Sequence, residues 1–300
     1  MTDEELFKIA LSALTEHWAT RSIPDAVAAP DYDRTFGRQI CRLMFEKSDR
    51  DVDRYRRALD DFIALSEEFV RLQFELDRTG KYPFSTFEEA RREVYDNPEV
   101  MDGRYLNGLF LSEAFWSNHS KIHAYFVAQF CSANSPSGTV LEVPCGTGIF
   151  ITEFARRNPG WDASAIDLSA SAVRFSGEIA RLNGGLPLTI SRQDIFELPR
   201  TQTYDRLICG ELLEHLEAPK LLLEKLALLT DERGKIFLTT AVWAANIDHI
   251  YLFKSAQEVR EMLQPFFEIE SELVLNVKDG FGPEDPQTPI NYACVLVKKR

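Results

Sequence analysis

The stretch TVLEVPCGTGIF, residues 139–150, decides the fold of the second half of the chain. Its first five residues have the pattern of a buried strand, and Gly146 and Gly148 follow before a helical segment. A strand, a glycine turn and a helix N-terminus together form an anion site, because glycine allows close backbone approach and the first helical N–H groups have no internal partners. The third glycine of a dinucleotide fingerprint and the lysine of a phosphate-binding loop are absent, so a plain structural turn stays an alternative.

Strands and helices alternate after this loop, which predicts parallel strands joined by right-handed crossovers in a doubly wound α/β sheet. The expected strands are 139–143, 162–167, 188–194, 204–210 and 235–242. Two further strands are expected near the end of the chain, FEIESELVLNV and INYACVLVKK, and a loop separates them where the earlier strands have a helix. They predict an antiparallel pair at the edge of the sheet.

The first half of the chain has helical periodicity throughout. One helix is expected from about residue 50 to 78, ended by Gly80, and a shorter one has Thr86 as its N-cap with a glutamate three residues on. A further helical zone, 103–130, is expected to break near Trp116. The turn-rich linker CSANSPSG, 131–138, then divides an all-helical cap, 1–130, from the α/β domain, 131–300.

Composition limits the classes of function. The 300 residues carry a formal net charge of −13 and show no basic footprint, so we expect no nucleic-acid partner and favour a small-molecule substrate. There is no apolar run of about 18 residues, and the start is acidic, so we expect no membrane span and a cytoplasmic protein. The five cysteines are scattered, which argues against a zinc site or a disulfide framework.

Acidic residues mark the ends of the next strands. Asp167 ends the second strand, 25 residues after Glu142, where a carboxylate holds ribose hydroxyls in nucleotide-binding units. A carboxylate can accept both hydroxyl protons of a cis-diol. Asp194 ends the third strand, and the fourth ends in CGELLEHL.

Together the motifs LEVPCGTGIF, AIDLS, RQDIFELP and YDRLICGELLEHL, in this order, resemble those of the class I S-adenosylmethionine-dependent methyltransferases. The resemblance covers roughly residues 137–300. It implies a Rossmann-like, seven-stranded sheet whose last pair is a hairpin with one antiparallel strand. It also implies S-adenosylmethionine as the cofactor.

The resemblance assigns roles to the glycine loop. The backbone from Gly146 to Gly148 would approach the methionyl part of the cofactor, and Glu142 would order the loop and reach the cofactor's amino group. The family's loop begins with glycine where this chain has Pro144, which fixes φ and removes an N–H. Pro144 is therefore expected to alter how the cofactor's tail sits.

The remaining cofactor contacts follow from the other strand ends. By the same resemblance, Asp167 would hold the ribose diol, with Leu168 against adenine. Asp194 would accept from the adenine amino group, with Ile195 beside the ring. Glu211 would lie near the methionyl end.

A first set of candidate acceptor-site residues precedes the cofactor domain, in AFWSNHSKIHAYF. This segment is similar to the N-terminal lids of small-molecule methyltransferases, with Trp116 and Asn118 as substrate contacts and His119 as a catalytic or substrate-binding residue. His119 and His123 have metal-ligand spacing on one helix face, but no third ligand is evident, so no metal is expected. Ordinary packing is the alternative for both.

A second set follows the fifth strand, in AANIDHIYLF, 244–253. Ligands of doubly wound sheets bind beyond the carboxyl ends of the strands, which makes Asp248 and His249 catalytic candidates, and Asn246 and Tyr251 substrate contacts. Capping of the following helix is the alternative for the Asp-His step. His215 is interpreted as structural.

The sequence therefore predicts a methyltransferase that acts on an oxygen or nitrogen of a small molecule, of the kind found in specialised metabolism. One alternative is a cyclase or lyase of the azetidine-2-carboxylate-forming type, which consumes the cofactor and releases methylthioadenosine. Another is a cofactor-binding protein without catalysis. The oligomeric state stays open, with a homodimer as one alternative, since helical extensions of this kind often form dimers.

Overall fold

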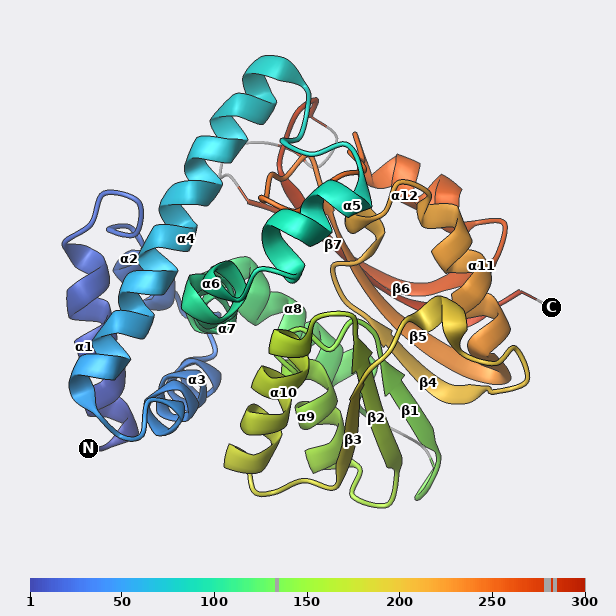
Figure 1. The fold of residues 1–300 in the computed structure, drawn as a ribbon, viewed down its shortest axis with the longest axis horizontal. Helices are drawn as coiled ribbons and strands as arrows, with labels where there is room; N and C mark the ends of the chain where they lie inside the picture. Colours follow the sequence, from blue (N-terminus) through green and yellow to red (C-terminus); the bar gives the residue numbers. More distant parts are fainter. Residues whose placement is uncertain (133–134, 278–281, 283–284, 300) are drawn as a thin grey trace.

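The computed structural model describes residues 1–132, 135–277, 282 and 285–299, and Figure 1 shows how its elements are arranged. Up to residue 130 the chain is helical, with π-helical turns at Arg91–Tyr95 and Met101–Tyr105. The α-helices of this part are α1 Asp3–Thr15, α2 Ile23–Val27, α3 Arg34–Lys47, α4 Val52–Thr79, α5 Phe87–Ala90, α6 Pro98–Val100, α7 Leu106–Phe115 and α8 Ser117–Gln129.

The second part alternates strands and helices as predicted. Its strands are β1 Thr139–Glu142, β2 Asp162–Asp167, β3 Leu188–Arg192, β4 Tyr204–Cys209, β5 Thr230–Val242, β6 Phe267–Asn276 and β7 Ile290–Lys298. Its α-helices are α9 Ile149–Arg157, α10 Ala170–Leu182, α11 Pro219–Leu229 and α12 Ala256–Leu263, with 3-10 turns at Ile195–Glu197 and Leu213–His215.

The strands form one seven-stranded sheet in the order β3-β2-β1-β4-β5-β7-β6. Strands β1 to β5 are parallel, and β7 is antiparallel to both of its neighbours, β5 and β6. The predicted α/β fold with a C-terminal antiparallel hairpin is therefore confirmed. Because β1 lies beside β4, the strand order reverses at this pair, where open α/β sheets bind their ligands.

Local capping signals set the ends of the first helices. Helix α4 begins after Asp51, whose carboxylate accepts from Arg54 N, and it ends at Gly80 with φ +66°, as predicted. Thr86 and Glu89 form the predicted capping box. The shorter helix continues beyond Ala90 as a π-helix, Arg91–Tyr95.

Two strand boundaries differ from prediction. Strand β3 ends at Arg192, two residues early, because the side chain of Asp194 accepts from Phe196 N, two residues further along, and starts a 3-10 turn. Strand β5 begins at Thr230, five residues before the predicted Lys235.

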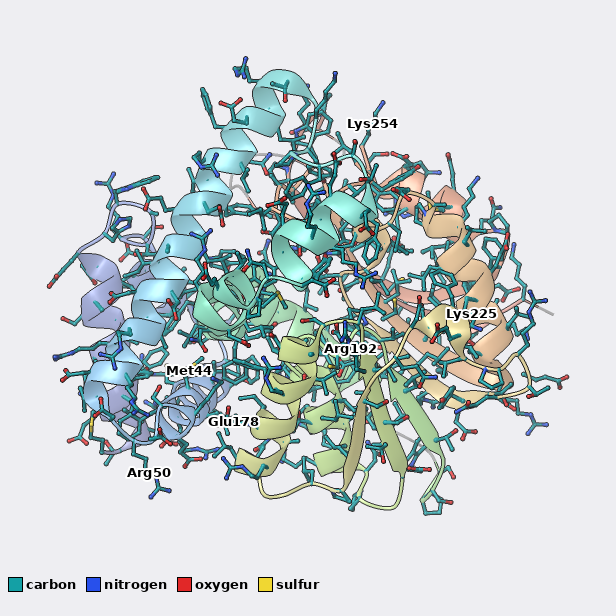
Figure 2. The ribbon with its side chains drawn as sticks, viewed as in Figure 1. Met44, Arg50, Glu178, Arg192, Lys225 and Lys254 are labelled. Carbon is teal, nitrogen blue, oxygen red and sulfur yellow. The ribbon has the colours of Figure 1, made fainter. Side chains whose placement is uncertain are left out.

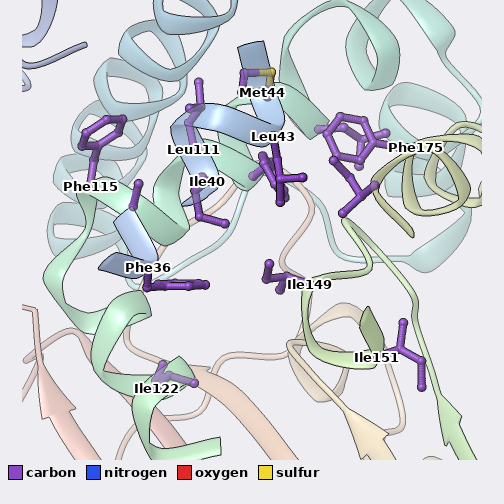
Figure 3. Close-up of a cluster of buried hydrophobic side chains, with 14 of the residues drawn as sticks. Phe36, Ile40, Leu43, Met44, Leu111, Phe115, Ile122, Ile149, Ile151 and Phe175 are labelled. Atoms are coloured by element: carbon purple, nitrogen blue, oxygen red, sulfur yellow. The ribbon is translucent and has the colours of Figure 1, made fainter. Parts of the chain in front are cut away.

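The helical part and the sheet share one hydrophobic core. Figure 3 shows Phe36, Ile40 and Met44 of α3 in one buried cluster with Ile149 of α9 and Phe175 of α10. The predicted boundary near residue 131 thus marks a change of secondary structure within a continuous core. Residues 133–134 of the predicted linker and residue 300 lie outside the described residues.

None of the helices in the described part of the chain has the length and apolar character that a bilayer span requires. All five cysteines are free and buried, as expected for small apolar side chains.

Candidate functional site

A cavity of about 480 Å³ lies where the carboxyl ends of the parallel strands meet the N-terminal helices. Its walls combine the loops after β1, β2, β3, β4 and β5 with residues of α4 and α7 and the π-helical turns between α5 and α7. We call the part near the glycine loop the loop end, and the part lined by α4, α7 and the segment 244–249 the cap end.

The glycine loop forms one wall of the loop end. Gly146 and Gly148 have φ of +46° and +72°, in the left-handed region that favours glycine. A Cβ on Gly148 would lie 2.9 Å from Ser176 Cβ, so α10 packs directly on the loop, whereas a Cβ on Gly146 would meet nothing within 4 Å. Pro144, which follows a cis peptide bond, also lines the cavity.

The loop is fixed to the end of β2 by a carboxylate. Asp167 Oδ2 accepts from Gly146 N at 3.0 Å, and Asp167 Oδ1 accepts from Ser169 N at 2.8 Å. Asp167 is only 9% exposed and lies on the cavity wall. Burial raises the pKa of Asp167 in spite of these backbone hydrogen bonds. Each carboxylate oxygen keeps a lone pair for a ligand.

Two further carboxylates lie at strand ends beside the cavity. Glu142 is buried, and its Oε2 accepts from Ile151 N at 3.2 Å, so it anchors the first turn of α9. Burial raises the pKa of Glu142 well above its usual value. Asp194 Oδ1 accepts from Phe196 N at 2.8 Å. Leu168 and Ile195 add apolar walls to the same end.

Glu211 lines the cavity from a strained backbone position. Its φ is +46°, which is uncommon for a residue with a Cβ, and its N–H is held by the carbonyl and the hydroxyl oxygen of Thr239 at 3.1 and 3.0 Å. Strain of this kind clusters at functional sites, where the surrounding structure enforces it.

Asp248 is the centre of a polar network at the cap end. Its Oδ2 accepts from the hydroxyls of Tyr95 and Tyr105 at 3.0 and 2.5 Å, and the two tyrosines belong to the π-helical turns. His215 Nδ1 lies 2.8 Å from the Tyr95 hydroxyl, and Asn246 Nδ2 donates to Tyr105. Burial raises the pKa of Asp248, but His215, His249 and the two hydroxyls outweigh it and lower the pKa overall.

The hydrogen bonds determine the tautomers of the cavity histidines. His249 Nδ1 lies 2.8 Å from the carbonyl oxygen of Ala244, which can only accept, so Nδ1 carries the proton and Nε2 a lone pair. Ser112 gives its hydroxyl proton to Leu109 O, so it accepts from His119 Nδ1 at 2.9 Å. Burial lowers the pKa of His119 and of His249 to about 4, which keeps both rings neutral near pH 7.

His215 has the same arrangement. Its Nδ1 also lies 3.1 Å from the backbone oxygen of Asp248, so Nδ1 is the donor and Nε2 again carries a lone pair. Sequence analysis interpreted His215 as structural, yet its ring lines the cavity. Its position directly after Glu214, beyond the fourth strand, was the signal available in the sequence.

Glu214, His215 and His249 bring one potential ligand atom each within 4.8 Å of one another. Each carboxylate oxygen of Glu214 accepts one hydrogen bond, from Thr240 Oγ1 at 2.6 Å and from Ala241 N at 3.2 Å. The absence of a metal stays a prediction of the sequence analysis.

Glu113 of α7 was missed by sequence analysis. It lines the cavity with a side chain that is 13% exposed, and its Oε2 is buried without a hydrogen-bond partner. Burial and the charge of Glu211 raise the pKa of Glu113 to about 8. Its Oε1 lies 3.8 Å from His119 Nδ1. An acidic residue within the apolar run LFLSEAFW was the available signal.

Most of the predicted acceptor-site residues lie on the cavity wall. Trp116, His119, Asn246, Asp248 and His249 all line it. Helix α12 is capped by the hydroxyl of Ser255, so the alternative in which the Asp-His step caps this helix is wrong.

The structure does not bring Asn118 and Tyr251 to the cavity wall. Asn118 Nδ2 donates to Asn276 O and to Asn291 Oδ1, and Asn291 is the residue that reaches the cavity. The Tyr251 hydroxyl donates to Glu258 Oε1 at 3.2 Å, which turns it toward α12. A direct substrate contact for either residue has no support in this arrangement.

Comparison with known proteins agrees with the geometry. Residues 115–272, just over half of the chain, match the family described as methyltransferase domain. The chain is 32% identical over 108 residues to a ubiquinone biosynthesis O-methyltransferase of Xanthomonas axonopodis pv. citri, which is 35% of this chain and 44% of that protein. It is 31% identical over 105 residues to a malonyl-[acyl-carrier protein] O-methyltransferase of Anoxybacillus flavithermus, 35% and 39% of the two chains. The chain thus spans less than half the length of these curated relatives.

Solved structures extend the likeness to the whole fold. Coclaurine N-methyltransferase superposes with a TM-score of 0.53 at 15% identity, over 93% of this chain and 98% of that one. N-methyltransferase NodS from Bradyrhizobium japonicum WM9 gives 0.50 at 13% identity, over 72% of this chain and 100% of that one. At these identities the comparison shows a shared fold, helical N-terminal part included in the first case.

Proposed function

Because the chain belongs to the class I S-adenosylmethionine-dependent methyltransferases, we propose that it transfers a methyl group from this cofactor to an oxygen or nitrogen of a small biosynthetic metabolite. The observation that carries the proposal is the single cavity that joins the glycine loop and the strand-end carboxylates to a second, polar end under the helical cap. A transferase needs both parts, one for its cofactor and one for its acceptor.

The residues of the loop end fit the cofactor. Open space beside Gly146 leaves room for a chain against the backbone of the loop. Asp167 offers carboxylate lone pairs to two ribose hydroxyls, Asp194 offers them to an adenine amino group, and Leu168 and Ile195 supply apolar surface for the ring. Glu142 and Glu211 offer carboxyl oxygens as partners for the cofactor's methionyl part. This donor and acceptor set supports cofactor roles for all these residues.

The cap end supplies groups that can orient an acceptor and move its proton. S-adenosylmethionine supplies an electrophilic methyl carbon, so the protein mainly has to hold a nucleophile about 3 Å from that carbon in line with its bond to sulfur. His249 Nε2 and His119 Nε2 carry lone pairs in neutral rings and can accept a proton from an acceptor. Asp248, fixed by two tyrosines, can orient it.

The same geometry bears on the two alternatives. A cyclase or lyase that consumes its own cofactor has no need of an acceptor chamber, whereas here Asp248 and Glu113 each keep a buried, unpartnered oxygen at the cap end. A protein without catalysis has no need of these groups either. Both observations favour transfer to a separate acceptor.

One experiment separates the three. The protein is incubated with S-adenosylmethionine alone and then with a mixture of small amines, phenols and alcohols, and the products are identified by mass spectrometry beside a protein-free control. We expect S-adenosylhomocysteine and a methylated acceptor only in the mixture. Methylthioadenosine above control would support the cyclase or lyase, and tight cofactor binding without any product would support the protein without catalysis.

The other expectations from the sequence keep the status of proposals. They are a cytoplasmic location, the lack of nucleic-acid partners, and a homodimer as one alternative for the oligomeric state. The division into a helical cap, 1–130, and a cofactor domain, 131–300, is likewise proposed as a division of labour, since the two parts share a core.

A further inference from the structure

The cap end of the cavity presents hydrogen-bond acceptors. His119, His215 and His249 each use Nδ1–H on a protein oxygen and leave the lone pair of Nε2. The hydroxyl protons of Tyr95 and Tyr105 go to Asp248. These groups can accept hydrogen bonds from the N–H or O–H donors of an occupant.

Negative charge accompanies these acceptors. Seven carboxylates line the cavity: Glu113, Glu142, Asp167, Asp194, Glu211, Glu217 and Asp248. Neither lysine nor arginine is found among the described residues of the cavity wall. Basic side chains such as Arg50, Arg192 and Lys254 are exposed on the outside of the molecule instead (Figure 2). The cofactor of the proposed reaction brings a net charge of only about +1, so a second cation would favour the ionised form of the buried carboxyl groups whose pKa burial raises, Glu113 among them.

Two of these carboxylates are incompletely satisfied. Asp248 is 1% exposed, and its Oδ1 has no hydrogen-bond partner although the residue lines the cavity. Glu113 Oε2 is buried and unpartnered as well. A buried carboxylate oxygen without a donor is costly, so such atoms mark places where a ligand supplies the missing hydrogen bond.

Glu113 lies near a group of aromatic rings, since its Oε1 is 3.8 Å from His119 Nδ1. The Trp116 ring centroid is 5.1 Å from that of His119 and 5.4 Å from that of Phe69. Phe69, Trp116 and His119 all line the cavity. A carboxylate beside the faces of aromatic rings is the environment that binds organic cations, through charge and through cation–π attraction.

We propose that the acceptor is a basic amine, whose ammonium form is held by Glu113 beside Trp116 and whose nitrogen receives the methyl group. The inference rests on the proposed function and narrows its acceptor from oxygen or nitrogen to nitrogen. A phenol or alcohol brings one donor and no charge, whereas an ammonium brings up to three donors and the positive charge that this end lacks.

The chemistry of transfer balances with these groups. The ammonium first gives one proton to the Glu113 carboxylate, whose pKa is raised by burial and by the charge of Glu211, and the nitrogen keeps its lone pair. That lone pair forms the bond to the methyl carbon, and the electrons of the carbon–sulfur bond pass to sulfur. The products are the methylated ammonium and neutral S-adenosylhomocysteine, and the proton on Glu113 leaves to solvent.

A pair of matched probes tests the inference on the full chain. Benzylamine and benzyl alcohol have nearly the same shape and differ in charge, and each is titrated calorimetrically into protein saturated with S-adenosylhomocysteine. We expect benzylamine to bind at least about tenfold more tightly. Glu113→Gln should remove most of this preference and leave the affinity for the alcohol unchanged, while the exposed control Glu232→Gln should behave as the unaltered protein.

The outcomes also separate this inference from the proposed function. Failure of S-adenosylhomocysteine to bind would refute the proposed function itself. Three results would overturn the amine inference alone, provided that S-adenosylhomocysteine binds. They are equal affinities for the two probes, tighter binding of the alcohol, and no binding of either probe. The comparison on the unaltered protein decides this even if Glu113→Gln does not fold, and a preference that survives in Glu113→Gln would refute the role of Glu113.

Discussion

Tyr95 donates its hydroxyl to Asp248 Oδ2 at 3.0 Å, although 153 positions separate the two residues in the chain. This hydrogen bond joins the helical cap to the loop after β5 at the cavity wall. Asp248 is therefore held in place by the part of the chain that covers it, and acceptor binding should depend on both.

Replacing Tyr95 tests this link. Tyr95→Phe leaves the ring and removes the hydroxyl, so Asp248 loses one of its donors, and we expect a loss of stability of about 1–3 kcal/mol together with a raised KM for the acceptor. Cofactor affinity should stay the same. The matched control is Tyr125→Phe, whose hydroxyl contacts Ser271 away from the cavity. Equal kinetic effects of the two substitutions would contradict the positioning of Asp248 by Tyr95.

The packing of α10 on the glycine loop leads to a second prediction. Gly148 has φ +72°, and a Cβ there would lie 2.9 Å from Ser176 Cβ, so Gly148→Ala should destabilise the protein by about 1–3 kcal/mol and weaken cofactor binding. Gly177→Ala, in α10 next to Ser176 and with no atom within 4 Å of the new Cβ, should be neutral or stabilising by up to about 1 kcal/mol. Urea unfolding measures both, and similar losses for the two variants would refute the account of the loop.

His249 is predicted to act on the acceptor's proton. His249→Gln can still donate toward Ala244 O but has no basic nitrogen, so turnover should fall by about 10²–10⁴ with cofactor affinity within about twofold of the unaltered protein. His17→Gln, on the outer surface of the cap, is the control. Steady-state kinetics with calorimetry of S-adenosylhomocysteine give the two quantities, and an unchanged turnover would remove His249 from the mechanism.

His123 gives a prediction for the dependence of stability on pH. It is buried against Phe36 with ring centroids 3.6 Å apart, and burial lowers its pKa to about 4, below the ordinary value of 6.5. Between these values the unfolded chain binds a proton that the folded chain does not. The contribution of neutral His123 to the free energy of unfolding is therefore lost as pH falls from 6.5 toward 4, by up to about 1.4 kcal/mol per pH unit.

The matched variant isolates this group from the other titrating residues. His123→Phe keeps an aromatic ring against Phe36 and cannot be protonated, so its stability relative to the unaltered protein should rise as pH falls from 6.5 to 4.5. Urea unfolding at several pH values measures the difference. A difference that does not vary with pH would show that His123 is protonated equally in both states.

The sheet and its glycine loop could be predicted because local sequence carries their signals. The alternation of strands and helices, the glycines at positive φ and the acidic strand ends each follow from a few neighbouring residues. The capping box at Thr86 and the helix end at Gly80 are of the same kind. Asp194 shows the limit, because its side chain caps a turn and so ends β3 early.

The acceptor end could be predicted only in part, because distant segments build it. Tyr95, Tyr105 and Glu113 reach the cavity through the packing of the cap on the sheet, and helical periodicity does not reveal which face covers a cavity. Asn118 shows the converse. It belongs to the predicted segment, but its amide donates to Asn291 near the start of β7, and Asn291 is the residue that lines the cavity.

The central claim is that the strand-end carboxylates and the glycine loop hold S-adenosylmethionine. Its most direct test is calorimetric titration of S-adenosylhomocysteine into the unaltered protein, Asp167→Ala and the control Asp162→Ala, which changes an exposed aspartate on the same strand. Asp167→Ala removes the carboxylate that accepts hydrogen bonds from the ribose and from Gly146 N. The binding free energy of S-adenosylhomocysteine should therefore weaken by about 2–4 kcal/mol in Asp167→Ala, while Asp162→Ala should bind as the unaltered protein does. Unchanged affinity in Asp167→Ala would contradict the account.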